Sequence, residues 1–280
     1  MKLKEYDPDV LNQVHQVELM ILKDFIQICE ENNLFYSVYG GSMIGAIRHK
    51  GFIPWDDDID VIMFREDYEK FEEIFLSSNN DKYELLTNDI EHDYCYPFTK
   101  FMLKNTTFEE EWMEQFSFHI GFNIDIFILD DTNDNKFKRF YITRKGLVYN
   151  RLLISSGVRL DYLPFFTRII SQGLNTILNF LNITPYKLTQ KYLKFLRKNS
   201  HKNSEFVFDF SANFAEFPLI FYREDFKDLI QVEFEDMYVS VPRNYDRVLK
   251  IHFGDYMTLP PEDKRVNHAI DIIDFGPYQK

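Results

Sequence analysis

The chain has 280 residues, of which 45% are hydrophobic and 17% aromatic, so it can bury a sizeable core and is not intrinsically disordered. Its formal net charge of −13 at pH 7 argues against a nucleic-acid partner, since a chain this acidic repels phosphate backbones. Two cysteines, Cys29 and Cys95, exclude a disulfide framework and a Cys-rich zinc site. We expect both as buried thiols in a reducing compartment.

No targeting or membrane-spanning segment is expected. The N-terminal residues lack the apolar core of a signal peptide, and the longest uncharged run worth testing, 169–186, contains too many polar residues to span a bilayer. We therefore expect a cytoplasmic protein, which could work at the inner face of the cytoplasmic membrane.

The first 130 residues predict an alternation of helices and strands. Apolar residues from Val10 to Ile28 recur at steps of three and four, which indicates an amphipathic helix. A second helix, opened by a Ser42 cap, is expected next. Strands are predicted over 34–39, 58–63, 83–86, 95–103 and 122–129, and helices over 42–51 and 65–78. This order is typical of an α/β or α+β core, which we assign to residues 1–150.

The middle of the chain differs in charge. Residues 151–202 contain nine Lys and Arg and one Asp, a net charge of +8, and apolar residues from Phe166 to Leu181 recur at helical spacing. We expect a basic, mostly helical subdomain over 151–204. Its basic face is either simply solvated, as charge runs usually are, or in peripheral contact with an anionic membrane or a lipid-linked acceptor.

Residues 205–280 are expected to complete the active site. The pattern predicts a hairpin over 229–242 that turns near Glu235-Asp236, then a helix over 243–254 that ends at Gly254. A C-terminal loop follows and carries Arg265 and His268.

Four aspartates stand almost side by side in PWDDDID, at positions 56, 57, 58 and 60. Like charges repel one another more strongly as the dielectric falls, so a folded site of this kind needs positive charge. On a strand, Asp58 and Asp60 would point to one face, roughly 7 Å apart. Asp125 in the apolar strand FNIDIFIL offers a third carboxylate. Such a set suits Mg²⁺, whereas an EF-hand fails because Val61 stands where glycine is required.

The stretch before the aspartates suits a phosphate group. A strand followed by Gly40-Gly41-Ser42 and a helix start lets backbone N–H groups approach an anion. Arg48 and His49 add nearby cationic side chains. A lone Gly-Gly-Ser is usually only a turn, and a run of Asp is usually a solvated loop. The combination, in this order, favours metal-dependent phosphoryl or nucleotidyl transfer.

The stretch GGSMIGAIRHKGFIPWDDDIDVIMFREDYEKF, residues 40–71, resembles the core motif of LicD-type phosphotransferases. That family includes bacterial phosphorylcholine transferases acting on lipopolysaccharide or teichoic acid and is related to fukutin-related protein. Residues 96–110, 119–131 and 241–268 resemble later family blocks in the same order, whereas the basic middle does not. Ile128 stands where many members have Pro, which concerns the exit of a strand more than the chemistry.

The resemblance implies an α+β, nucleotidyltransferase-like fold with a mixed sheet flanked by helices. It also implies a CDP-linked alcohol donor, a hydroxyl of a cell-surface or capsular glycan or its lipid-linked precursor as acceptor, and CMP as product. Phosphorylcholine is the expected group; ribitol and glycerol remain open. Asp58, Asp60 and Asp125 would be catalytic and, with Asp56, would bind Mg²⁺ or Mn²⁺. The expected substrate-binding residues are Gly40, Gly41, Ser42, Arg48, His49, Lys100, Arg265 and His268.

Two other functions stay open. A true nucleotidyltransferase would use the same aspartates and turn, but would consume a nucleoside triphosphate and release pyrophosphate. A non-catalytic module that binds a glycan or nucleotide could keep the fold, although it would gain nothing from clustered carboxylates. A bare surface lysine is likewise the alternative for Lys100, and a satisfied or surface histidine the alternative for His268.

Overall fold

The computed structural model describes residues 5–110, 113, 116, 118–157, 165–211, 219–268 and 270–279. Its first half contains α1 Pro8–Glu31, β1 Ser37–Val38, α2 Gly40–Ile44, a π-helical turn Gly45–His49, β2 Asp60–Phe64, α3 Arg65–Ser77, β3 Tyr83–Leu86, β4 Thr99–Leu103, β5 Thr107–Glu109 and β6 Asn123–Asp131. Its second half contains α4 Lys136–Gly157, α5 Phe165–Phe180, α6 Pro185–Asn199, β7 Phe206–Asp209, β8 Leu219–Tyr222, β9 Leu229–Phe234, β10 Met237–Pro242, α7 Tyr245–Phe253 and β11 Ile272–Asp274.

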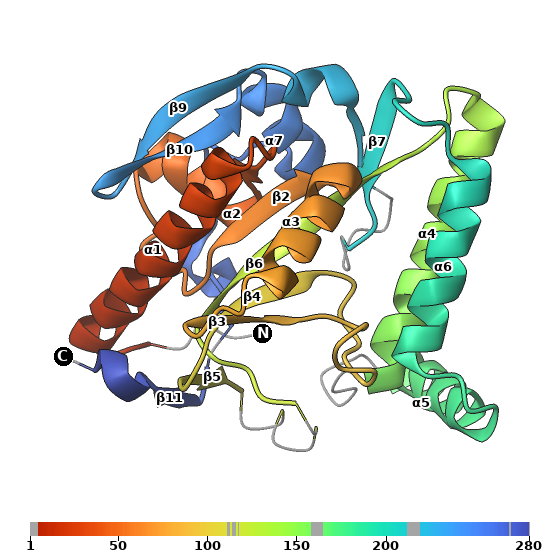
Figure 1. Ribbon diagram of the computed structural model, residues 1–280, viewed down its shortest axis with the longest axis horizontal. Helices are drawn as coiled ribbons and strands as arrows, with labels where there is room; N and C mark the ends of the chain where they lie inside the picture. Colours follow the sequence, from red (N-terminus) through yellow and green to blue (C-terminus); the bar gives the residue numbers. More distant parts are fainter. Residues whose placement is uncertain are drawn as a thin grey trace.

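A mixed sheet organises the fold. Its strands follow the order β1-β2-β6-β4-β3, and β7 joins the far end of β6 and pairs with β8. Strands β2 and β6 are parallel, whereas the other pairs are antiparallel. Figure 1 shows α1 and α3 in front of this sheet and α4 and α6 side by side at one end of it. The predicted α+β class with a mixed, helix-flanked sheet is confirmed.

Helix α1 is stabilised by the residues at its start and by its buried apolar face. Asp7 caps it by accepting a hydrogen bond from the Asp9 N–H, and Pro8 occupies the first turn, where no N–H is needed. In its apolar stripe, Ile21 and Phe25 are fully buried, and Phe25 packs against Phe71 of α3 and Phe101 of β4. Cys29 on α1 and Cys95 are free and buried, as predicted.

The central strands alternate as expected of a sheet with two differently used faces. In β6, Ile124 and Ile126 are fully buried in the core, and Asp125 between them points to the opposite face. The hairpin of β9 and β10 and the end of α7 at Gly254 are confirmed.

The start of α2 differs from the prediction. Tyr39, not Ser42, occupies the cap position, and no side chain caps the helix. Ser42 lies inside the helix, where its buried hydroxyl accepts a hydrogen bond of 2.8 Å from the Asp60 N–H. The Ser42 hydroxyl, which we predicted to cap the helix, therefore forms a tertiary hydrogen bond with the Asp60 backbone instead. Strand β4 also starts at Thr99, later than predicted.

The basic middle of the chain is helical, as predicted. Helices α4, α5 and α6 share a small core, in which Leu153, Leu178 and Leu188 pack with Phe208 of β7. The expected boundary at residue 150 falls inside α4, because that helix begins at Lys136. Within the described residues, we find no helix that combines the length and the apolar character needed to cross a membrane.

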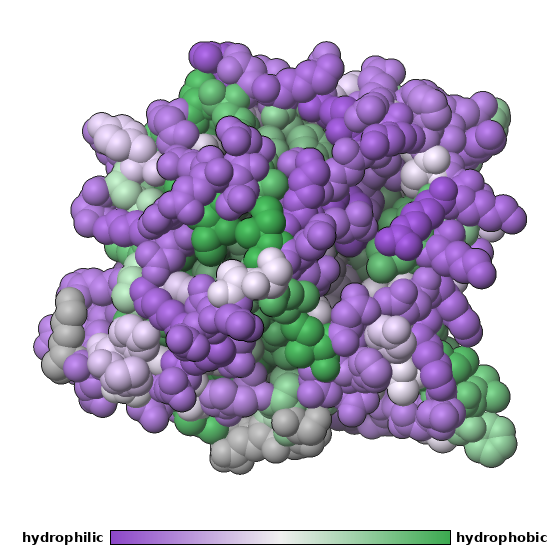
Figure 2. All heavy atoms as spheres, viewed as in Figure 1, coloured by the Kyte–Doolittle hydropathy of each residue, from purple (hydrophilic) through white to green (hydrophobic). Residues whose placement is uncertain are grey.

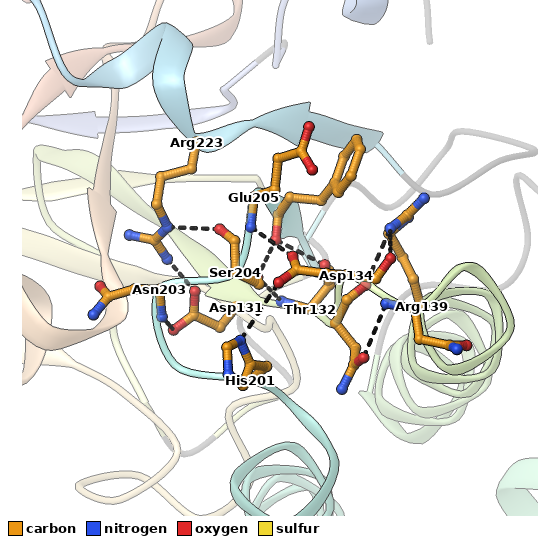
Figure 3. Close-up of polar contacts among 12 residues, drawn as sticks. Asp131, Thr132, Asp134, Arg139, His201, Asn203, Ser204, Glu205 and Arg223 are labelled. Carbon is orange, nitrogen blue, oxygen red and sulfur yellow. Dashed lines mark hydrogen bonds and ion pairs between the residues drawn. The ribbon is translucent and has the colours of Figure 1, made fainter.

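A polar junction joins the helical part to the end of β6 (Figure 3). The Arg223 guanidinium forms an ion pair with Asp131 and donates to the Ser204 carbonyl at 3.0 Å. The Asn203 N–H also donates to Asp131, and the Thr132 N–H donates to the Ser204 hydroxyl at 3.1 Å. The junction therefore fixes the chain that leaves α6 against the strand that carries Asp125.

Replacing Asp131 with Ala should destabilise the fold, because Arg223 would keep its charge in a mostly buried position without its carboxylate. We expect the free energy of unfolding to fall by about 1–3 kcal/mol. Urea unfolding followed by circular dichroism measures this change. Asp263→Ala, at an exposed position, is the control. A loss for Asp131→Ala no larger than that of the control would contradict the role of the junction.

Candidate active site

The parallel pairing of β2 with β6 brings two aspartates together. Asp60 is the direct register partner of Asp125, so both carboxylates lie on the same face of the sheet. The backbones of the two strands are about 5 Å apart. The Asp125 N–H donates to the Ile59 carbonyl at 2.9 Å, which extends this alignment back toward Asp58. Asp58 itself lies just before the strand and is partly exposed.

Negative charge at this edge is only partly compensated. Burial raises the pKa of Asp60 well above its ordinary value, and the charges of Asp58, Asp125 and Asp56 raise it further. The pKa of Asp56 is also raised, first by burial and then by Asp58. Burial raises the pKa of Asp58 as well. These carboxyls therefore hold their protons more tightly than free aspartates do when no cation is present.

Lys100 supplies one positive charge. It faces Asp125 across the β4–β6 pair, and its Nζ donates to Asp125 Oδ1 at 2.7 Å and to Asn123 Oδ1 at 3.1 Å. This side chain is largely buried. We predicted from the sequence that Lys100 binds donor phosphate. In the structure, Lys100 forms an ion pair with Asp125.

His268 supplies the second positive charge from the C-terminal loop. The Nδ1 atom of His268 lies 3.2 Å from Asp57 Oδ1 and 3.7 Å from Asp58 Oδ2. The backbone N–H of His268 also donates to Asp57 Oδ1 at 3.0 Å. The charge of Asp58 raises the pKa of His268 well above 6.5, against the opposing effect of burial. Asp57, Asp58 and His268 offer ligand atoms that all lie within 4.8 Å of one another, a possible metal-binding group.

The two glycines let the α2 turn approach the aspartates closely. Gly40 has φ +54°, and a Cβ built there would lie 2.5 Å from Asp60 Oδ2. A Cβ at Gly41 would lie 3.0 Å from Asp56 Oδ2. A side chain at Gly40 would therefore both strain the backbone and displace a carboxylate of the site.

The chain has clear relatives. A family model described as LicD/FKTN/FKRP, nucleotidyltransferase domain, matches residues 33–155. The chain is 30% identical over 267 residues to the lipopolysaccharide cholinephosphotransferase LicD of Haemophilus influenzae, which covers 93% of this chain and 96% of that protein. The chain belongs to the LicD family. It is thus an enzyme of the LicD transferase type.

Shorter matches cover parts of the chain. An uncharacterized protein of Rickettsia prowazekii is 32% identical over 80 residues, 29% of this chain and 28% of that protein. An uncharacterized protein of Caenorhabditis elegans is 37% identical over 65 residues, 23% of this chain and 17% of that protein.

The other cationic residues predicted from the LicD resemblance, Arg48, His49 and Arg265, contact groups other than the aspartates. Arg48 donates to the Tyr256 carbonyl at 2.6 Å and to His49 Nε2 at 2.9 Å, which ties the turn after α2 to the C-terminal part of the chain. The Arg265 guanidinium lies 4.6 Å from the centre of the Trp55 ring, next to the aspartates. In the described part of the chain, Arg48, His49 and Arg265 form no ion pair with the aspartates at positions 56–60.

Sequence reasoning missed the structural role of Asp57 in this LicD member. Asp57 is fully buried, and its Oδ2 accepts a hydrogen bond of 2.6 Å from the Tyr6 hydroxyl. Burial alone would raise the pKa of Asp57, but hydrogen bonds from His268 and Tyr6 lower it below its ordinary value. Asp57 therefore anchors the run between the two ends of the chain. No local signal in the sequence separates it from its neighbours.

One cavity of the molecule does not contain the aspartates. It has a volume of about 400 Å³ and lies between α3 and α6, where Thr99, Asn88 and Gln190 line it. Thr99 and Lys100 point to opposite faces of β4, so the sheet separates this cavity from the Lys100–Asp125 pair.

The oxygen-rich donor set fits a hard divalent cation. Asp56, Asp58, Asp60 and Asp125 act on one another electrostatically, and the two nearby cationic side chains leave a net negative charge. A bound divalent cation would relieve that excess, so the residues present fit such an ion.

The protein treated with EDTA should lose stability as pH rises from 5 to 8. Asp56, Asp58 and Asp60 have raised pKa values in the fold. Their protonation therefore contributes a stability that is complete below about pH 4 and is lost as pH rises through the raised pKa values. His268 acts in the same direction, with its loss beginning above 6.5. Asp57 has the opposite sign, but its contribution is complete above about pH 4.

Thermal unfolding across this pH range measures the effect, with and without Mg²⁺. The divalent cation should restore stability most at pH 8, because its ligands must be deprotonated. Asp60→Asn should flatten the pH dependence in EDTA. A midpoint that stays constant or rises between pH 5 and 8 in EDTA would contradict this account of the charge cluster.

Proposed function

We propose that this protein transfers a phospho-alcohol, phosphorylcholine first among them, from a CDP-linked donor to a hydroxyl of lipopolysaccharide or its lipid-linked precursor. One observation carries the proposal: Asp60 and Asp125 are register partners with Asp58 beside them, inside a chain that matches a lipopolysaccharide cholinephosphotransferase over 93% of its length. Acidic residues on adjacent strands beside a glycine turn suit a diphosphate bound with a divalent cation.

Asp58 and Asp60 would hold Mg²⁺ or Mn²⁺, with Asp56 in support. When bound, the metal supplies positive charge to the phosphate oxygens of the donor. Gly40 and Gly41 keep the turn free of side chains at the point where it meets Asp60 and Asp56, which leaves backbone N–H groups for donor phosphate.

Asp125 would orient the acceptor hydroxyl and take its proton. The acceptor oxygen forms a bond to the phosphorus that carries the alcohol, the bond from that phosphorus to the CMP oxygen breaks, and the hydroxyl proton passes to Asp125. Lys100 fixes one oxygen of Asp125 at 2.7 Å, so the other oxygen can face the acceptor. His268 and Arg265 lie on the C-terminal loop beside the run, where they would offset charge on the donor.

Substitution of the metal-binding carboxylates tests this mechanism. Asp58→Asn and Asp60→Asn should each lower metal-dependent release of CMP from CDP-choline by about 100-fold or more, since each removes charge from the reacting centre. Asp81→Asn, at an exposed loop position, is the control and should retain full activity. Release of CMP is followed with a panel of CDP-alcohols and with Mg²⁺ or Mn²⁺.

The products decide between the candidate reactions. CMP from a CDP-alcohol supports the proposal, whereas pyrophosphate from a nucleoside triphosphate would identify a nucleotidyltransferase. Wild-type turnover in either Asn variant would remove that carboxylate from the mechanism. Donor binding without turnover and without any metal dependence would indicate a non-catalytic module.

We further propose that α5 rests on an anionic membrane, where a lipid-linked acceptor would be presented. Four of its apolar side chains, and Leu181 directly after it, are at least half exposed and form one stripe: Ile169, Ile170, Ile177, Phe180 and Leu181. Figure 2 shows hydrophobic residues at the lower right, where Figure 1 places α5. On neighbouring α6, five basic side chains are exposed: Lys187, Lys191, Lys194, Arg197 and Lys198. Apolar and basic groups together favour an anionic lipid surface.

Vesicle sedimentation tests this contact. The protein should pellet with vesicles that contain phosphatidylglycerol at low salt, and less with pure phosphatidylcholine or at high salt. The double variant Ile177→Asp, Phe180→Asp should stay in the supernatant. Tyr238→Asp, at an exposed position in the β9–β10 hairpin, should bind as wild type does. No pelleting of the wild type at low salt would contradict the membrane contact.

A further inference from the structure

Glu18 occupies an unusual place for an acid. It lies on the buried face of α1, and its exposed fraction is 1%. The neighbouring positions of that face, among them Val14, Val17, Ile21 and Leu22, are apolar and buried. A carboxyl group in such a position costs free energy unless it has a hydrogen-bond partner or a compensating charge.

The carboxyl of Glu18 has no such partner within the described residues. Neither Oε1 nor Oε2 makes a hydrogen bond. The fully buried acids elsewhere in the fold are paired. Asp57 accepts from Tyr6 and His268, Asp130 from Arg65, Asp209 from Tyr39 and Ser211, and Asp225 from Arg247. Glu18 is therefore an exception that packing alone does not explain.

The N-terminal part of α1 lies against the aspartate run. His15 Nε2 donates to the Asp56 carbonyl at 2.8 Å, and Tyr6, which precedes the helix, donates to Asp57 Oδ2 at 2.6 Å. Glu18 follows His15 by three residues, so it lies on the same side of the helix. Burial raises the pKa of Glu18 well above its ordinary value, and the further causes, in order, are Asp58, Asp57, Asp56 and Asp125. Glu18 thus lies on the side of α1 that contacts the aspartate run.

We propose that Glu18 is a further member of the carboxylate set that binds the divalent cation. The proposal rests on the metal dependence of the proposed function and adds a ligand group from α1, far from the family motif in sequence. A cation beside Asp58 would supply the compensating charge that the Glu18 carboxyl lacks. Without a cation, the carboxyl stays as an unpaired buried group that weakens the fold.

The alternative is that Glu18 is a neutral, purely structural group. The variant Glu18→Gln separates the two, since it keeps the size of the side chain and removes its charge. Glu31→Gln, an exposed position near the end of the same helix, is the matched control. The measurements are the dissociation constant for Mn²⁺ by titration calorimetry and the thermal unfolding midpoint in EDTA and in Mn²⁺.

We expect Glu18→Gln to bind Mn²⁺ at least about tenfold more weakly than the wild type, with a smaller rise of the midpoint on adding Mn²⁺. In EDTA, Glu18→Gln should be at least as stable as the wild type. Glu18→Met, which fills the site with an apolar side chain, should be more stable in EDTA and should show the same loss of Mn²⁺ affinity. Glu31→Gln should match the wild type in every measurement.

Equal Mn²⁺ affinity of the wild type, Glu18→Gln and Glu18→Met would overturn the role of Glu18 and leave the proposed function intact. Absence of Mn²⁺ binding by the wild type itself would overturn both. Loss of binding in Glu18→Gln and Glu18→Met, with the control unchanged, would establish the assignment, because a purely structural carboxyl would move stability without moving the affinity for the cation.

Discussion

Mutual repulsion among partly buried carboxylates is the constraint on which the rest of this structure depends. The β2–β6 register sets Asp60 beside Asp125, and Asp58 and Asp56 approach from the preceding segment. Lys100 and His268 bring two positive charges to this group. Two positively charged side chains do not balance the aspartates. The site is therefore stable only when its carboxyl groups bind protons or a divalent cation.

Several parts of the chain cooperate to hold the repelling groups in place. Ser42 binds the backbone of Asp60, His15 binds the backbone of Asp56, and Tyr6 and His268 bind Asp57. These contacts come from α2, from α1 and from both ends of the chain. The aspartate segment is therefore fixed mainly through its backbone and through Asp57, which leaves the carboxylates of Asp58 and Asp60 for a ligand.

The sequence was informative where a local pattern decides the structure. Apolar periodicity predicted α1 and the hairpin of β9 and β10, and the acids inside apolar strands were expected on a common face. Tertiary contacts decided the rest. The Ser42 hydroxyl binds Asp60 instead of capping its helix, and no spacing rule relates Glu18 to residues forty positions later. Helical spacing in α5 predicted the helix but not that its apolar stripe stays exposed.

Anomalous diffraction from crystals soaked in Mn²⁺ would test the central claim most directly. The account predicts a single strong peak, or a close pair of peaks, beside Asp58 and Asp60, at distances of about 2.0–2.3 Å from their carboxylate oxygens. Ordered crystals that contain Mn²⁺ elsewhere but none beside Asp58 and Asp60 would contradict it.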